Sequence, residues 1–339
     1  MTTIARRTFM RLNTMRLPRR EFLRLAASAA AVQAWPRIAV AFDYPTRPVR
    51  ILVGFAPGSA PDIVARLIGQ WLSDRFAQPF IVENKPGGTS TLANEAVINA
   101  APDGYTLLMV GIAYAINPTL YKNPDYNFAR DLTPVAGLNR EPNVMIVNSA
   151  FPGKNVPEFI AYANANPGKI NMASPGVGTS PHMAGELFKF LAGVDMTHVA
   201  YRSSASVLTD LLGGQVQVYF APISASIEHI RAGRVRALAV TTATRAAALP
   251  DVPPLGDFVP GYEMTAWYGL AAPKKTPAEI IDRLNKEINV GLNDPGMTSR
   301  LAALGSSAFP VSPAEFGKFI ADETEKWAKV IQAANIKLD

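Results

Sequence analysis

The sequence predicts an α/β fold built on mostly parallel sheets, and two observations support this prediction. Short apolar runs rich in valine, isoleucine and leucine alternate with longer segments whose apolar residues recur at helical spacing. Such alternation is typical of chains in which a helix crosses over between neighbouring parallel strands. The chain has 339 residues, which is enough for two domains with ample core.

The amino-terminal segment, residues 1–41, has the pattern of an export signal. Its eight arginines and single acid, Glu21, give it a charge of +7. The arginine pair of RREFLR precedes an alanine-rich run from Leu25 to Ala34, and AVA then offers small residues for cleavage before Phe42. This order resembles the twin-arginine export signal of bacteria.

An amphipathic helix or a membrane anchor is the alternative interpretation of this segment. The apolar run is shorter than the roughly 20 residues that a membrane-spanning helix needs. We therefore expect a cleaved signal and a mature chain in the periplasm. A start at Met10 or Met15 would place the arginine pair nearer to the terminus.

The remaining 298 residues carry 25 basic and 26 acidic side chains, so their net charge is −1. The positive charge of the whole chain therefore belongs to its first segment, and the rest shows no electrostatic footprint for nucleic acid. The sequence has no cysteine, which excludes disulfides, thiol catalysis and thiolate metal ligands.

The elements of the α/β pattern follow one another from residue 49 onward. VRILVGF from Val49 predicts a buried strand, and DIVARLIGQWLSDRF from Asp62 predicts a helix. FIVEN and YTLLMVG predict two more strands, with a helix near residues 94–100 between them. Farther along, GKINMAS, GQVQVYFA and VRALAVTT predict strands separated by helical stretches.

Two helices with clear start signals end the chain. TPAEIIDRLNKEI and SPAEFGKFIADETEKWAKVI each open with a hydroxyl residue, a proline and, three residues after the first, a glutamate. This spacing predicts capping boxes at Thr276 and Ser312. The last helix carries an apolar stripe that predicts packing against a core: Phe316, Phe319, Ile320, Trp327, Val330 and Ile331.

A weak internal repeat links two loops. ILVGFAPGSAPDIVARLIG, from Ile51, and INMASPGVGTSPHMAGELF, from Ile170, both read as strand, Gly/Pro loop, proline and helix. They lie about 120 residues apart, which is roughly one domain. If each belongs to its own α/β lobe, both helices start at the carboxyl end of a sheet, where ligands bind in open α/β folds.

The two loops have features of an anion site. A helix start exposes unpaired N–H groups and a partial positive charge. Ala60, at the predicted cap position of the first helix, has no side-chain acceptor, whereas Ser180 is a plausible cap for a helix starting at Pro181. Gly58, Gly176 and Gly178 allow close approach to the backbone.

The loops contain no lysine or arginine and match neither the P-loop nor the dinucleotide-binding pattern. A singly charged carboxylate therefore fits them better than a polyphosphate does. The alternative is that these Gly-rich turns serve packing alone.

Asp62 and His182, which lie near the two helix starts, each have two possible roles. Asp62 either complements the helix dipole or faces a donor group on a ligand. His182 is more consistent with a ligand donor or a structural side chain than with a general base, because the sequence has no G-x-S-x-G elbow and no H-E-x-x-H motif. We therefore expect neither catalysis nor a metal site nor a cofactor.

Eight phrases occur in order along the chain: YPTRPVRILVGFAPGSAPDIVARL, IVENKPGG, AAPDGYTLL, INPTLY, INMASPGVGTSPHMAGELF, TDLLGGQV, HIRAGRVRALAVTT and LPDVPPL. Together they resemble the substrate-binding receptors of tripartite tricarboxylate transporters, the Bug-type periplasmic proteins. The resemblance covers essentially the whole chain after residue 41.

The resemblance implies a two-lobed, type II-like periplasmic binding protein with a ligand cleft between lobes that each have a mixed, mostly parallel sheet. Lobe I would comprise residues 42–142 and 265–339, and lobe II residues 143–264. The strands NVMIVN and AWYGLAAP mark the crossings. The resemblance also implies that a small carboxylate is held by backbone N–H groups, partly through water.

Carried onto this chain, the family's ligand contacts fall on the two loops and on aromatic residues of the cleft. The first loop contributes Ala56, Pro57, Gly58, Ser59, Ala60 and Asp62. The second contributes Ser174, Gly176, Gly178, Thr179, Ser180 and His182. Tyr114, Tyr201, Ala221 and Pro222 complete the predicted site.

Several departures from the family pattern surround this pocket. PGSAPD replaces a more glycine-rich first loop and gains Pro61, STLA follows NKPGG, and Ser203 stands where a glycine is common. Ala221 replaces a common acid. A stiffer first loop and the uncharged Ala221 favour a less polar carboxylate as ligand.

The sequence thus predicts an extracytoplasmic solute receptor that delivers a small carboxylate to membrane transporter subunits. We expect it to be a monomer. A periplasmic α/β enzyme that uses Ser180 and His182, and a sensory receptor for a signalling partner, are the alternatives.

Overall fold

The computed structural model describes residues 43–87, 90–121 and 127–336, and residues 44–339 form one compact unit. The predicted export signal lies outside the described residues. No helix of the described ranges combines the length and the apolar character that crossing a membrane requires.

One half of the structure, which contains both ends of the described chain, is built on a mixed sheet in the order β2-β1-β3-β9-β4. Strand β1 pairs in parallel with β2 and β3, whereas β9 runs antiparallel to both β3 and β4. Its strands are β1 (Val49–Val53), β2 (Phe80–Asn84), β3 (Thr106–Gly111), β4 (Leu132–Asn148), β9 (Thr265–Pro273) and the short β10 (Ser307–Ala308), which pairs with β4.

Strand β4 joins the two halves without interruption. Its first part, Leu132–Pro142, pairs with β9, and its second part, from Asn143, pairs with β7 and β8. The order then continues as β7-β5-β6, and β5 is parallel to both neighbours. The strands are β5 (Asn171–Ser174), β6 (Thr197–Ala200), β7 (Val218–Pro222) and β8 (Val235–Val240).

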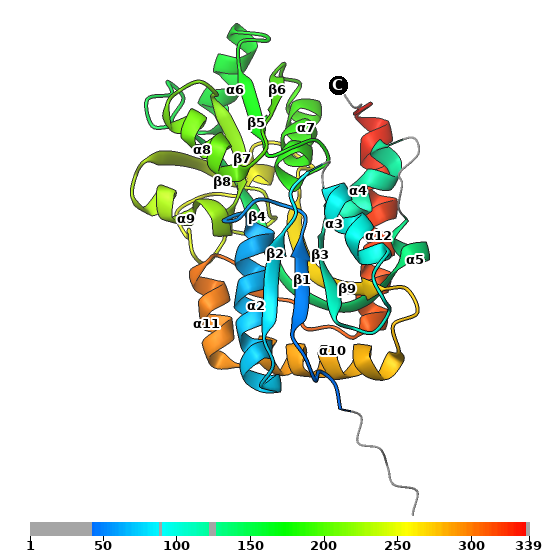
Figure 1. Cartoon of the computed structure of the whole chain (residues 1–339). Helices are drawn as coiled ribbons and strands as arrows, with labels where there is room; N and C mark the ends of the chain where they lie inside the picture. The colour runs from blue at the N-terminus through cyan, green and yellow to red at the C-terminus, as the bar shows by residue number, and fades with distance from the viewer. Residues whose placement is uncertain (1–42, 88–89, 122–126, 337–339) are drawn as a thin grey trace, which may run out of the picture. The chain divides into compact units, whose positions relative to one another are not determined.

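The helices divide in the same way (Figure 1). The half that contains β1 carries α2 (Ala60–Phe76), α3 (Thr91–Ile98), α4 (Ala113–Leu120), α5 (Phe128–Asp131), α10 (Ala278–Leu292), α11 (Pro295–Ala303) and α12 (Pro313–Ala333). The half that contains β5 carries α6 (Val156–Ala165), α7 (Ser180–Ala192), α8 (Ser204–Leu212) and α9 (Ile223–Arg231), and a 3-10 turn follows at Leu255–Asp257. The predicted alternation of strands and helices is confirmed. The lobe limits at residues 142 and 265 stay a prediction.

The start of α12 is the capping box predicted from SPAE. Ser312 Oγ accepts from the Glu315 N–H, and the Glu315 carboxylate accepts from the Ser312 N–H at 2.8 Å. The box predicted at Thr276 is wrong, because α10 begins one residue later, after Pro277. The Thr276 hydroxyl instead donates to the Pro273 carbonyl at 2.8 Å.

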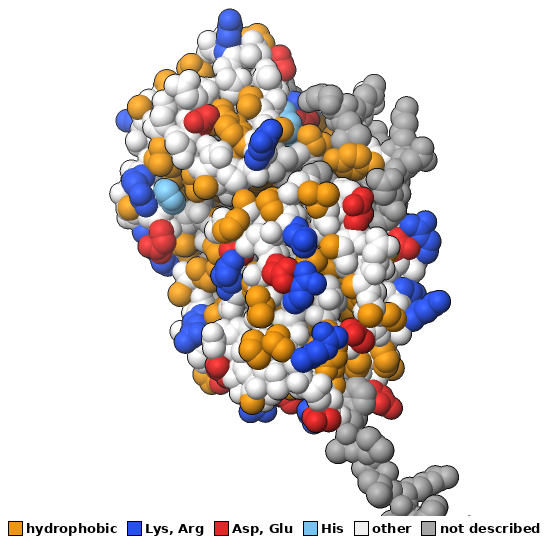
Figure 2. Space-filling model, in the orientation of Figure 1, with side chains coloured by type: hydrophobic (Ala, Val, Ile, Leu, Met, Phe, Trp, Pro, Cys, Tyr) orange, Lys and Arg blue, Asp and Glu red, His pale blue; other side chains and the backbone are white. Residues whose placement is uncertain are grey.

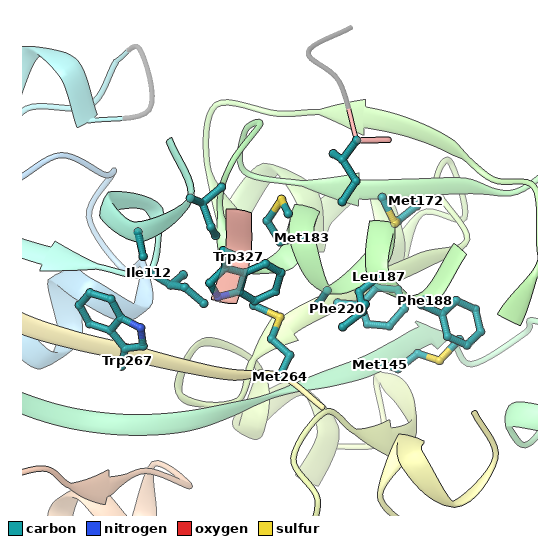
Figure 3. Close-up of a cluster of buried hydrophobic side chains, with 14 of the residues drawn as sticks. Ile112, Met145, Met172, Met183, Leu187, Phe188, Phe220, Met264, Trp267 and Trp327 are labelled. Carbon is teal, nitrogen blue, oxygen red and sulfur yellow. The ribbon is translucent and has the colours of Figure 1, made fainter. Parts of the chain in front are cut away.

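One apolar cluster extends through both halves of the structure. Figure 3 shows Met145, Phe188 and Phe220 on one side and Trp267 on the other, with Trp327 of α12 between them. The predicted stripe of α12 is confirmed, because its residues are buried in or packed against this cluster. Burial of this kind supplies most of the stability of a domain.

The surface is electrostatically mixed. On the face in Figure 2, basic and acidic side chains are interspersed and no broad patch has a single sign. This agrees with the net charge of −1 expected for the chain after residue 41.

Candidate ligand-binding site

A pocket lies where the starts of α2 and α7 meet the end of β3 and the start of α4. It holds about 510 Å³ of empty space, part of it open to solvent. We call this space the inner pocket. Its lining residues are Phe55, Ser59, Ala60, Pro61, Met109, Val110, Gly111, Ile112, Ala113, Tyr114, Pro175, Thr179, Ser180, Pro181, Ser204, Pro222 and Tyr268.

The two helix starts are built alike, but each begins one residue earlier than the sequence predicted. The cap residues are Ser59 and Thr179, both in extended conformation, and the prolines at 61 and 181 are the second residues of their helices. Neither cap side chain accepts a hydrogen bond from its helix. The Ser59 hydroxyl is buried and has no partner among the described residues.

Each loop is closed by the side chain four residues after its glycine. The Gly58 N–H donates to Asp62 Oδ2 at 2.9 Å, and the Gly178 N–H donates to His182 Nδ1 at 3.2 Å. Both glycines have a left-handed φ, +78° and +76°, which side chains disfavour. These two N–H groups are therefore committed within the loops.

The helix-start amides remain available. Within the described part of the chain, the N–H groups of Ala60, Asp62, Ser180 and His182 have no acceptor. Prolines 61 and 181 have no N–H group to satisfy. Each helix start therefore offers backbone donors and a partial positive charge, and the residues Ala60 and Ser180 line the inner pocket.

Asp62 supports the first loop from within the protein. Burial alone would raise the pKa of its carboxyl, but hydrogen bonds from Arg66, Gly58 and Asn84 outweigh this effect and lower the pKa. The distances are 3.0 Å from Arg66 Nε and 2.8 Å from Asn84 Nδ2. Both carboxylate oxygens are thus used inside the protein, and Asp62 is not among the lining residues.

His182 supports the second loop in the same way. Burial, with smaller contributions from His198 and Lys189, lowers the pKa of His182 to about 3, so the ring is neutral. Its Nδ1 accepts from Gly178, which places the ring proton on Nε2. The rings of His182 and His198 lie 4.2 Å apart, and His198 Nε2 is 2.7 Å from Ser174 Oγ. Of the two roles left open for His182, the contacts support the structural one.

A second space, which we call the outer chamber, adjoins the inner pocket and shares Phe55 and Pro175 with it. Its remaining lining residues are Gly54, Ala56, Pro86, Gly87, Gly176, Tyr201, Arg202 and Ser203.

The predicted site residues separate into three groups. The inner pocket is lined by Ser59, Ala60, Tyr114, Thr179, Ser180 and Pro222. The outer chamber is lined by Ala56, Gly176 and Tyr201. The lining of these two spaces does not include Pro57, Gly58, Asp62, Ser174, Gly178, His182 and Ala221.

Several lining residues were not predicted from the sequence. Tyr268 comes from β9, which pairs with β3 across the sheet, and Met109 and Ile112 come from the end of β3 and the turn into α4. For Met109 and Ile112 the one sequence signal is a position near the carboxyl end of a strand, and Tyr268 lacks even this signal because it lies near the amino end of β9. Antiparallel pairing between segments more than 150 residues apart gives no such signal.

A buried polar group lies behind the inner pocket on β4. Asn139, Glu141 and Asn143 alternate along the strand, are at most 1% exposed and each keep one side-chain oxygen without a partner among the described residues. Burial raises the pKa of Glu141 to about 7, although hydrogen bonds from Ser224 lower it in part. Tyr268, which lines the pocket, lies beside Glu141.

The described residues contain no group of three or more His, Asp or Glu side chains placed to hold a metal ion. The inner pocket is lined by apolar and hydroxyl side chains and contains no charged side chain among the described residues that line it. What it offers a ligand is apolar surface, hydroxyl groups and the backbone N–H groups of two helix starts.

The comparisons with known proteins identify a family. Residues 64–336 match the model of the tripartite tricarboxylate transporter family receptor. Protein BugT of Bordetella pertussis is 32% identical over 320 residues, which cover 94% of this chain and 96% of BugT.

Solved structures agree with this match. Rpa4515 of R. palustris, solved with adipate, has a TM-score of 0.85 and 34% identity, and the match covers 87% of this chain and 99% of that one. The periplasmic binding protein BugD has a TM-score of 0.83 and 32% identity, and the match covers 87% of this chain and 99% of BugD. MatC of Rhodopseudomonas palustris, solved with malate, has a TM-score of 0.81 and 31% identity, and the match covers 85% of this chain and 100% of MatC.

These matches confirm the resemblance to the Bug-type receptors that eight short sequence motifs, in the same order, indicated. They also confirm the two-lobed periplasmic binding protein fold, in which β4 joins two α/β halves. The matched family is one of solute receptors and not of enzymes. The chain therefore belongs to the family of tripartite tricarboxylate transporter receptors.

Proposed function

We propose that this protein is a periplasmic receptor that binds a small carboxylate in the inner pocket and delivers it to the membrane subunits of a tripartite tricarboxylate transporter. One observation supports this most directly. Two helix starts, one from each half of the structure, bring Ala60 and Ser180 to the same pocket, and their N–H groups have no acceptor among the described residues.

The chemistry of the pocket suits a carboxylate. The dipoles of α2 and α7 both favour a negative charge at their starts, and the buried Ser59 hydroxyl is available as a further donor. Hydrogen bonds to a charged group contribute about 1.5–3 kcal/mol each. The structures of Rpa4515 with adipate and MatC with malate, both from relatives, support the same ligand class.

The proposal includes the finer assignments made from the sequence. Residues 1–41 act as a cleaved export signal, and the lobes comprise residues 42–142 with 265–339 and residues 143–264. The protein acts as a monomer, and hinge motion at the β4 and β9 crossings closes the cleft. The apolar lining, including Phe55, Met109 and Ile112, supports a ligand less polar than citrate or an amino acid.

Calorimetric titration tests the proposal with a panel of acids: adipate, hexanoate, benzoate, malate, citrate and aspartate. We expect one-to-one binding of at least one of the less polar acids. Mass spectrometry after incubation should recover that acid unchanged. A preference for citrate or aspartate would contradict the less polar ligand, and consumption of the acid would contradict a receptor.

Replacing Gly178 with alanine should weaken binding of adipate by more than about tenfold. An added Cβ would meet the Asn117 side chain, and the left-handed φ of +76° adds strain of roughly 1 kcal/mol. The second loop must then shift, and the start of α7 moves with it. Titration of the variant with adipate measures the effect.

Gly193→Ala is the matched control for this variant. Gly193 has a similar φ, +65°, but lies at the end of α7, and nothing lies within 4 Å of an added Cβ. Gly193→Ala should lose about 1 kcal/mol of stability from the left-handed φ alone and Gly178→Ala at least as much, whereas only Gly178→Ala should lose affinity. Equal affinity in the two variants would show that the second loop does not take part in binding.

A further inference from the structure

The outer chamber differs from the inner pocket in its charge. Arg202 is the one charged side chain among the described residues that line it. Lys85 precedes the lining residue Pro86 but does not itself line the chamber. Among the described residues of the lining, Arg202 is therefore the one side chain that can form an ion pair with a ligand.

Arg202 has no ion-pair partner among the described residues. By contrast, Arg66 of α2 is paired with Asp62 at 2.9 Å, so its charge is compensated within the protein. Arg202 has neither a salt bridge nor a side-chain hydrogen bond in the described part of the chain, and it is exposed. Its guanidinium is therefore free to pair with an anion.

The backbone on both sides of Arg202 is fixed. The Tyr201 N–H donates to the Ser174 carbonyl at 2.8 Å, and the Tyr201 hydroxyl donates to Asp210 at 2.7 Å. On the other side, Ser203 caps α8 and accepts from the Ser206 N–H at 3.1 Å. These contacts anchor the chain next to the chamber, so Arg202 is held at its wall.

The shared lining connects the two spaces. Phe55 and Pro175 belong to both, so the two spaces meet at two apolar side chains that lie between the helix starts and Arg202. A methylene chain suits that passage. A second carboxylate at its far end would meet the planar guanidinium, which binds carboxylates with two hydrogen bonds.

We propose that Arg202 binds the far carboxylate of a linear dicarboxylate whose first carboxylate is held at the starts of α2 and α7. This inference rests on the proposed function, because it assumes that a carboxylate occupies the inner pocket. A single side chain, Arg202, then selects the ligand both by its length and by its second negative charge. The receptor then prefers a linear dicarboxylate to the monocarboxylate of equal length.

A comparison of adipate with hexanoate distinguishes binding at Arg202 from binding in the inner pocket. They have the same number of carbons, and only adipate carries the second carboxylate. For the unchanged protein we expect adipate to bind about tenfold more tightly than hexanoate at low salt, and added salt should reduce the difference. In Arg202→Gln, the affinity for adipate should fall to that for hexanoate, while the affinity for hexanoate stays unchanged.

Lys169→Gln is the control, because Lys169 is exposed, has no ion pair among the described residues and lies before β5, away from the chamber. It removes the same charge and should leave both affinities unchanged. Arg202→Lys should keep part of the preference for adipate, since it keeps the charge without the planar fork. Thermal unfolding confirms that each variant is folded.

The outcomes distinguish this inference from the proposed function. If the unchanged protein binds both acids equally, or if Arg202→Gln weakens both to the same extent, the assignment of Arg202 is overturned and the receptor function stands. If the unchanged protein binds neither acid nor any other carboxylate of the panel, the proposed function falls and the inference falls with it.

Discussion

Replacing Ala60 with proline should lower the affinity for adipate by about 10- to 100-fold and leave the stability of the fold nearly unchanged. Ala60 is the first residue of α2, a position that proline favours because its N–H would have no helical partner. Ser59 has a ψ of 157°, which suits a residue before proline. The substitution therefore removes one backbone donor from the inner pocket with little effect on the helix.

The size of the effect follows from the charge of the acceptor. A hydrogen bond to a carboxylate contributes about 1.5–3 kcal/mol, and tenfold in affinity corresponds to about 1.4 kcal/mol. The ring of the new proline also occupies the place of the ligand oxygen. Titration with adipate gives the change in affinity, and thermal unfolding gives the change in stability.

Ser180→Pro repeats the experiment at the other helix start. Ser180 is the first residue of α7, and Thr179 has a ψ of 161°. Because this variant also removes the hydroxyl that accepts from Asn143 at 3.4 Å, Ser180→Ala is its control, and Ala60→Ser is the control for the first. If both proline variants bind adipate as the controls do, the backbone N–H groups of the helix starts do not hold the ligand.

Local patterns predicted the parts of the site that lie next to one another in the sequence. The two strand–loop–helix units and the prolines after their starts occur as expected, because proline, glycine and apolar periodicity act within a few residues. The cap position was displaced by one residue in both loops, since a proline is tolerated at the second helical residue as well as at the first, where its missing N–H has no helical partner.

A local pattern also failed to fix the first residue of the helix after Thr276. The sequence TPAE offers the spacing of a capping box, but the hydroxyl bonds to the Pro273 carbonyl, and the turn at the end of β9 delays the helix by a residue. At Ser312 no competing acceptor of this kind is present among the described residues, and the box forms.

The residues that complete the pocket could not be predicted because they depend on long-range pairing. Tyr268 reaches the site only because β9 lies between β3 and β4. The same holds for the buried polar residues of β4. Asn139 lies opposite Tyr268, and Glu141 lies opposite Ala266, in a register that no local pattern determines.

Glu141→Gln should make the protein more stable at neutral and alkaline pH, and the size of the gain should depend on pH. Burial raises the pKa of Glu141 from an ordinary value of 4.5 to about 7 in the folded protein. Between these two values the folded protein keeps the proton, whereas the unfolded chain loses it. The free energy of unfolding therefore falls as pH rises through this range, by up to about 1.4 kcal/mol for each pH unit.

The glutamine variant lacks this titration. Its amide oxygen can still accept from the Ser224 N–H, which lies 3.1 Å from Glu141 Oε2. Near pH 4.5 the two proteins should have similar stability, and above pH 7 the variant should be more stable by about 3 kcal/mol, the full cost of ionising the buried carboxyl. Urea unfolding at pH 5, 6, 7 and 8 measures the difference.

Exposed Glu325 provides the matched control, because Glu325→Gln removes the same charge at the surface, where Glu325 pairs with Lys329. That variant should change stability little, since solvent screens an exposed ion pair and side-chain entropy offsets what attraction remains. A constant difference between Glu141→Gln and the unchanged protein from pH 5 to 8 would mean that Glu141 does not titrate in this range. The carboxyl behind Tyr268 would then keep one charge state while the receptor binds its ligand.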